Sequence, residues 1–161
     1  MLQRLQTLYF IISIVLFGFL FSGVNFLKFI GPGGREVDTI DLFGRTSYYT
    51  SHGKEIIVSS EMIPLVVLNL GMILLLTMCI FSFKKIHRQL NISRFTFLVN
   101  ALLVILFVIW STYLFIDSPE GKSNSVQWGF YLLCCTLPFT YFGYKGVLRD
   151  KMLLDSIDRI R

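Results

Sequence analysis

Residues 84–94 read KKIHRQLNISR, a short basic stretch between two long apolar runs. The stretch carries four Lys or Arg residues and no acidic residue. A concentration of Lys and Arg between apolar runs is typical of cytoplasmic loops in membrane proteins. The pattern predicts a cytoplasmic loop between two membrane spans, and the interpretation of the rest of the chain starts from it.

The overall composition also indicates a membrane protein. The chain has 161 residues, of which 54% are hydrophobic and only 16% charged. Soluble globular domains are about a quarter charged, so this chain has more apolar residues than one buried core needs. The formal net charge is +5, but the cations lie at the ends of apolar runs rather than in one patch. The expected partner is therefore the lipid bilayer, and nucleic acid is not an expected partner.

Four apolar runs are each long enough to cross a hydrocarbon core of about 30 Å. The predicted spans are about 8–29, 62–83, 95–116 and 126–144. The short connections after the second and third runs favour antiparallel neighbours. The predicted fold class is therefore an all-α membrane protein, an up-down four-helix transmembrane bundle, with residues 1–161 as a single domain.

Two segments outside these spans have their own predicted structure. Residues 30–61 are polar and form the predicted outer loop. Within it, Thr46–Ser51 and Glu55–Ser59 are rich in strand-favouring residues, and His52-Gly53 is suited to a turn, so a small β-hairpin is expected. Residues 145–161 are expected to continue the last helix as a cytoplasmic tail.

The distribution of charge predicts the orientation in the membrane. Both termini and the 84–94 stretch together carry ten Lys or Arg residues and three acidic residues. The opposite side carries five Lys or Arg residues and seven acidic residues. Because cations accumulate on the cytoplasmic side, both termini are expected in the cytoplasm.

The polar residues within the spans suggest contacts between helices. No charged residue lies in the middle of a predicted span, and buried amides usually form interhelical hydrogen bonds. Counting helical rise from the span ends, Asn25 and Asn69 are expected to approach, and Asn100 is expected at the level of Thr140. The candidate interhelical polar residues are therefore Asn25, Asn69, Asn100 and Thr140. The alternative role for the asparagines is the lining of a channel.

The C-terminal tail is the candidate partner-binding surface. Leu153, Ile157 and Ile160 fall on one narrow helical face, and Arg159 and Arg161 add positive charge near it. The alternative interpretation is a solvated charge cluster that only orients the protein. The three cysteines lie inside apolar runs without metal-site spacing. No catalytic, metal or cofactor site is expected.

Both ends of the chain carry family motifs. The opening MLQRLQTLY and the close VLRDKMLLDSIDRIR resemble the M-x-Q-R-x-Q-[ST]-[LVI]-Y start and S-x-D-R-x-R end of a family of small four-span inner-membrane proteins from Bacteroidota-type bacteria. That family is known only as a domain of unknown function. Asp155 stands where the family often has a cation. The resemblance implies a bacterial inner-membrane location with four spans, and it implies no activity.

These observations favour a structural or accessory membrane protein that acts through a protein partner or a second copy of itself. One alternative is a small membrane transporter or channel. A second and less favoured alternative is a membrane enzyme, which would need a cluster of His, Asp, Glu or Cys at one interface. The chain is therefore not expected to be an enzyme.

Overall fold

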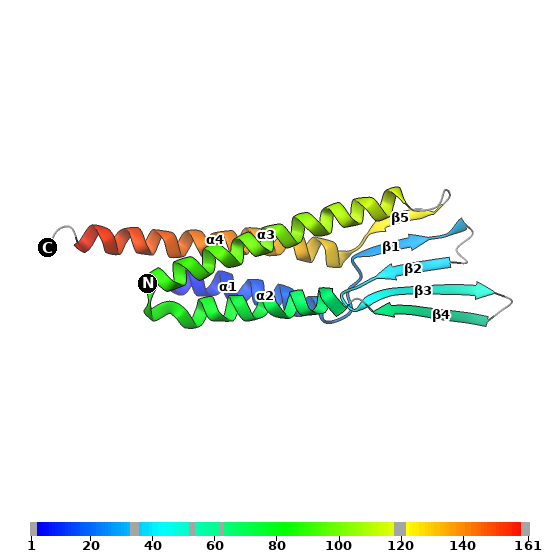
Figure 1. The fold of residues 1–161 in the computed structure, drawn as a ribbon, viewed down its shortest axis with the longest axis horizontal. Coiled ribbons are helices and arrows are strands. Elements are labelled where there is room, and N and C mark those ends of the chain that lie inside the picture. The colour runs from blue at the N-terminus through cyan, green and yellow to red at the C-terminus, as the bar shows by residue number, and fades with distance from the viewer. Residues whose placement is uncertain (1–2, 33–35, 52–53, 62, 118–121, 159–161) are drawn as a thin grey trace.

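Helices and strands lie end to end in an elongated molecule (Figure 1). The structure is a computed structural model, and it describes residues 3–32, 36–51, 54–61, 63–117 and 122–158. Within these ranges, the helices lie side by side, and the strands extend beyond the ends of the helices. The last described residue, 158, lies at the end of the molecule opposite the sheet.

The apolar runs form long helices that alternate in direction. α1 packs against α2 and α4, and α3 also packs against α2 and α4. The 3-10 turn η2 (Ser82–Lys84) links α2 to α3. The helices of the described residues are α1 (Gln3–Leu20), α2 (Ile63–Phe81), α3 (Ile86–Ile116) and α4 (Trp128–Asp158).

The strands form one antiparallel sheet in the order β4-β3-β2-β1-β5. Asp41 shapes the turn between β2 and β3, because its Oδ1 accepts hydrogen bonds from the N–H groups of Phe43 and Gly44 at 2.9 and 2.8 Å. β5 joins the sheet from far along the chain and pairs with β1. The strands are β1 (Leu27–Ile30), β2 (Glu36–Ile40), β3 (Gly44–Ser51), β4 (Lys54–Glu61) and β5 (Ser123–Val126).

The predicted fold class, an all-α four-helix transmembrane bundle, is wrong. The sheet has five strands, whereas a single hairpin was expected. β3 and β4 form that hairpin, and their predicted turn at 52–53 lies outside the described residues. By length and composition, only α2 and α3 among the described helices could cross a membrane, and the apolar part of α1, Leu5–Leu20, is shorter.

The early end of α1 explains why residues 8–29 were wrongly predicted to form one helical span. α1 ends at Leu20 instead of near residue 29, and Gly23 follows with a φ of +74°, which an L side chain adopts only with strain. Leu27–Ile30 then alternates between buried and half-buried side chains, as a strand with one covered face does. The basic stretch 84–94 is also mostly helix, because α3 begins at Ile86.

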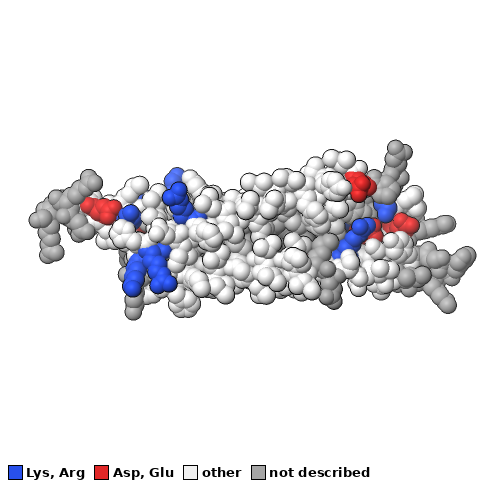
Figure 2. All heavy atoms as spheres, viewed as in Figure 1, with Lys and Arg blue, Asp and Glu red and all other residues white. Residues whose placement is uncertain are grey.

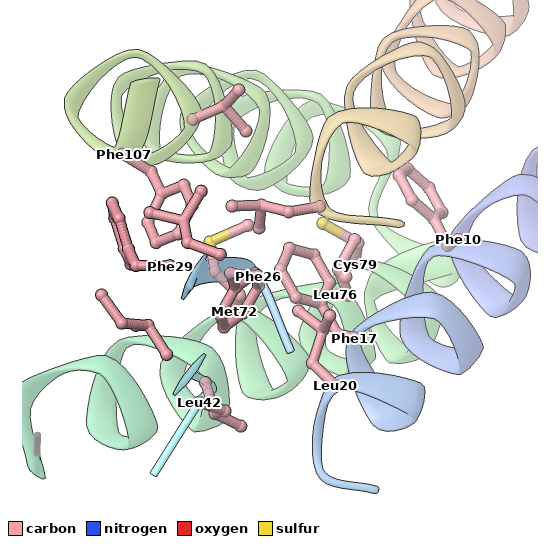
Figure 3. Close-up of a cluster of buried hydrophobic side chains, with 14 of the residues drawn as sticks. Phe10, Phe17, Leu20, Phe26, Phe29, Leu42, Met72, Leu76, Cys79 and Phe107 are labelled. Atoms are coloured by element: carbon pink, nitrogen blue, oxygen red, sulfur yellow. The ribbon is translucent and has the colours of Figure 1, made fainter. Parts of the chain in front are cut away.

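The core is thickest where the helices meet the sheet. Phe26, which precedes β1, is buried and its ring centroid lies 4.9 Å from that of Phe107 in α3. Farther along the sheet, the rings of Phe29 and Phe115 lie 5.6 Å apart. Figure 3 shows side chains from α1, α2, α3 and the sheet converging at this junction, among them Phe17, Leu20, Leu42, Met72 and Leu76. Apolar packing therefore joins the helices to the sheet.

Two glycines allow α1 and α4 to approach closely. A Cβ on Gly143 would lie 2.5 Å from the ring of Phe10, and one on Gly146 would lie 2.6 Å from Gln6 Cγ. Phe10 is only 1% exposed, so its ring has no free space to move into. Beside this contact, Gln6 Nε2 donates a hydrogen bond to Asp150 Oδ2. The α1–α4 interface is therefore closely packed at the end away from the sheet.

We expect Gly143→Ala to destabilise the protein by about 1–3 kcal/mol, the usual cost of overpacking a close contact. The matched control is Gly18→Ala in α1, where the added Cβ meets nothing within 4 Å. The control should be neutral or stabilising by up to about 1 kcal/mol, because alanine favours helix. Thermal unfolding of both variants in the same detergent measures the difference, and equal midpoints would contradict the close packing.

Candidate functional site

A buried carboxylate, Asp38, lies at the centre of a cluster of ion pairs on the sheet. The Asp38 side chain on β2 is 2% exposed, and its Oδ2 lies 2.9 Å from Arg45 Nη2 on β3 and 3.3 Å from Lys122 Nζ. Lys122 also lies 3.4 Å from Glu36 Oε2, two residues before Asp38 on the same face of β2. The cluster therefore ties β2 to the segment that leads into β5.

The surroundings of Asp38 favour its ionised form. Burial raises the pKa of this carboxyl, but the Ser47 hydroxyl, the Arg45 guanidinium and the Lys122 ammonium lower it, and the net pKa lies below the ordinary value. Asp38 Oδ1 has no hydrogen-bond partner among the described residues. An ionised, paired carboxylate of this kind suits a structural role in the sheet better than proton transfer at neutral pH.

A second polar cluster lies between α3 and α4. Asn100 Nδ2 donates to Thr136 Oγ1 at 3.1 Å and to Thr140 Oγ1 at 3.0 Å. Thr136 Oγ1 lies 3.2 Å from Asn100 Oδ1, and none of the three residues is more than 1% exposed. Asn100 and Thr140 are thus brought together at one level, as their positions along the predicted spans indicated.

Asn25 and Asn69 were expected to approach from two helices, but only Asn69 lies in a helix. Asn25 lies in the link between α1 and β1, beyond the end of the helix that was expected to carry it, and its carbonyl accepts a hydrogen bond from Gly129 N at 2.9 Å. Asn69 is buried in α2, and its Oδ1 has no partner among the described residues. It borders a cavity of about 20 Å³ whose other walls are apolar.

The candidate partner-binding tail is only partly described. Leu153 is 44% exposed on α4, next to the exposed Met152 and Leu154. The side chain of Ile157 and the residues Arg159, Ile160 and Arg161 lie outside the described part of the chain. Figure 1 shows the end of α4 extending beyond the other helices, so the described part of this apolar surface is not covered by α1, α2 or α3.

The edge of the sheet formed by β4 is a further exposed apolar surface. Among the described strands, β4 pairs with β3 alone, and its side chains Ile57 and Val58 are 61% and 54% exposed. Ile57 lies opposite Tyr48 of β3, which is 41% exposed. The run EIIVS was visible as a strand in the sequence, but its position at a sheet edge depends on pairing with distant segments.

Possible metal ligands are scattered in this structure. Within the described residues, no group of three or more His, Cys, Asp or Glu side chains is placed to hold a metal ion. The Asp38 ion pairs and the Asn100 hydrogen bonds are two of the polar clusters in the described part. Its exposed apolar surfaces lie on the helices and along β4.

We expect the two buried asparagines to respond differently to replacement by leucine. Asn100→Leu removes the side-chain hydrogen bonds to Thr136 and Thr140, but both threonines keep bonds to their own helix, so the cost should be about 1–2 kcal/mol. Asn69→Leu removes an oxygen without a partner from apolar walls, so it should be neutral or stabilising. Unfolding of the two variants in the same detergent tests this, and an equal loss would contradict it.

The Asp38 ion pairs should make the sheet sensitive to acid. Because the folded-state pKa lies below that of the unfolded chain, ionised Asp38 contributes stability above roughly pH 4 and loses it as the pH falls through the folded-state pKa. Asp38→Asn should cost about 1–3 kcal/mol at neutral pH and should flatten the loss of stability below roughly pH 4. Asp117→Asn, at an exposed acid, is the control and should leave the acid dependence of unfolding unchanged.

Comparison with protein families matches residues 2–160 to the family described as Domain of unknown function (DUF4293). Comparison with curated proteins finds no match. The family match spans nearly the whole sequence and agrees with the resemblance seen at its two ends, at the level of a family without an assigned function. The chain therefore belongs to the DUF4293 family of domains of unknown function.

Proposed function

We propose that this protein is an integral membrane protein that acts as a structural or accessory component, by binding partners and not by catalysis. The observation that carries the proposal is the exposed apolar surface of the helices. Val15 of α1, Leu74 of α2 and Leu106 of α3 are 50%, 53% and 56% exposed, and many of their neighbours are similar. In water a surface of this extent promotes aggregation, whereas lipid covers it without cost.

The lengths of α2 and α3 support this proposal. The 19 residues of α2 rise about 28 Å, close to a hydrocarbon core of about 30 Å. Only 22% of the apolar window of α2 and 28% of that of α3 are buried within the protein, so most of each window lies at the surface, as it does in a membrane span. On the face shown in Figure 2, charged side chains lie toward the two ends of the molecule, and the band between them is uncharged.

The charge asymmetry supports an orientation. The side that holds the start of α3 and the end of α4 carries the larger share of Lys and Arg, and the positive-inside rule favours a cytoplasmic location for that side. The sheet then lies outside, with its acidic residues. In a bacterium with the predicted inner-membrane location, the sheet would face the periplasm.

Two exposed apolar surfaces outside the proposed bilayer support a binding role. One is the β4 edge with Ile57 and Val58, which offers backbone groups and apolar side chains to an added strand. The other is the end of α4 with Met152, Leu153 and Leu154. A protein partner or a second copy of the chain fits either surface better than a small substrate does, because each is exposed and apolar.

The membrane proposal is tested by extraction and by labelling. The protein should stay in the membrane fraction at alkaline pH. In a variant without native cysteines, a cysteine at the exposed Ser59 should react with an impermeant thiol reagent in spheroplasts, and one at the exposed His87 should react only after lysis. Release into the soluble fraction would refute membrane integration, and the reverse labelling pattern would refute the orientation alone.

The binding role is tested by photo-cross-linking in living cells. A photoreactive residue at Ile57 on the β4 edge should give one defined adduct, because a docked strand lies beside it. The matched control is Ser123, an exposed position on the opposite edge strand β5, and it should give no such adduct. Identical patterns at both positions would contradict a specific partner surface on β4.

A further inference from the structure

A long apolar groove runs between α2 and α3. Its volume is about 1080 Å³, and its walls include Leu68 and Leu75 of α2 with Val99, Leu102 and Leu106 of α3. Gly71 lies on the groove without a side chain, and a Cβ there would meet nothing within 4 Å. The missing side chain therefore leaves open space along the middle of the seam.

A second pocket continues the groove toward the end of the molecule away from the sheet. This pocket has a volume of about 570 Å³ and shares Leu74 with the groove. Its walls change from apolar to polar, because Ser82, Lys85 and Arg88 line it. On α3, Arg88 and Ile92 of this pocket continue the helical face of Phe95 and Val99 in the groove. The two hollows therefore form one channel-shaped surface with an apolar part and a basic end.

The basic end has no internal counter-charge. Lys85 and Arg88 are exposed, and neither forms a salt bridge within the described residues. Neither α2 nor α3 contains an acidic residue. No side chain caps the start of α3 at Lys85, so the positive end of the helix dipole adds to the two cations.

We propose that this surface binds one anionic phospholipid, with the phosphate at Lys85 and Arg88 and an acyl chain in the α2–α3 groove. The inference rests on the proposed membrane location, which puts the basic end at the cytoplasmic leaflet. An apolar groove beside a basic pocket between helices matches the two parts of such a lipid. A zwitterionic lipid carries a cation beside its phosphate, so it neutralises the positive charge of Lys85 and Arg88 less well.

A second copy of the chain is a poorer occupant of the same surface. Docking through the α2–α3 seam of another copy would bring two sets of Lys85 and Arg88 toward apolar walls, and the helices of that seam supply no acidic residue to pair with them. Burying unpaired cations is costly. The phosphate of a lipid supplies the missing negative charge, and its acyl chain covers the groove.

The test measures which lipid the protein retains. The full-length protein is placed in nanodiscs that contain equal amounts of phosphatidylglycerol and phosphatidylcholine, and the lipids that stay bound after its release are identified by native mass spectrometry. The wild-type protein should retain phosphatidylglycerol preferentially. The double variant Lys85→Gln/Arg88→Gln should lose about 25-fold in this preference, since each cation near an anionic lipid contributes roughly a fivefold factor. The matched control Arg94→Gln/Arg149→Gln removes the same charge at exposed positions outside the pocket and should keep the preference.

A second variant tests the apolar part of the site without changing charge. Gly71→Leu fills the groove and should reduce retention of phosphatidylglycerol. In the wild-type protein, soluble glycerol phosphate should not compete with phosphatidylglycerol, because it has no acyl chain to occupy the groove. The proposal would be overturned if the wild-type protein retained both lipids equally, or if the control variant lost as much preference as the Lys85→Gln/Arg88→Gln variant. It would also be overturned if glycerol phosphate competed effectively, or if the wild-type protein formed a dimer that disappeared in Gly71→Leu. Alkaline extraction of the same variants shows whether membrane integration persists, so failure of the lipid site is distinguished from failure of the membrane proposal.

Discussion

The pairing of β1 with β5 is the constraint on which the rest of the structure depends. β1 follows α1 after a short link, and β5 directly precedes α4, so the antiparallel register from Leu27 opposite Val126 to Ile30 opposite Ser123 brings these two helices together. Gln127 N and Gly129 N extend the contact by donating to the carbonyls of Phe26 and Asn25, both at 2.9 Å. A Cβ on Gly129 would lie 2.8 Å from the Asn25 carbonyl oxygen, so the backbones touch directly.

Close contact between α1 and α4 follows from this pairing and is completed at the other end of the helices. Gly143 and Gly146 let α4 approach Phe10 and Gln6 of α1. α2 and α3 then occupy the remaining sides and leave the groove along their own seam. The closely packed interface therefore lies between α1 and α4, whereas the groove lies between α2 and α3.

The sequence predicted what depends on local pattern. Long apolar runs indicated the helices, and strand-favouring residues indicated β3 and β4. The depth of Asn100 and Thr140 followed from counting residues along helices, and the two are hydrogen-bonded. The same count assumed that Asn25 lies in a helix, which is wrong, because an apolar run alone did not reveal that α1 ends at Leu20.

What the sequence did not predict depends on pairing between distant segments. β1 and β5 have four residues each, too few for a recognisable alternating pattern, and β1 lies inside a run apolar enough to be taken for helix. The contact between Asp38 and Lys122 depends on the same distant pairing. No spacing within the sequence indicates that these two side chains meet.

The length of α3 has a mechanical consequence. Its 31 residues rise about 46 Å, which exceeds a hydrocarbon core of about 30 Å. Its first turn carries Arg88, and its last turn carries Phe115, whose ring lies against Phe29 of the sheet. A helix longer than the bilayer adapts to its thickness by tilting, and a change of roughly 10° over this length displaces one end by about 8 Å. When α3 lies in a membrane, its length beyond the hydrocarbon core therefore has to be accommodated by tilting or by an end that extends past the core.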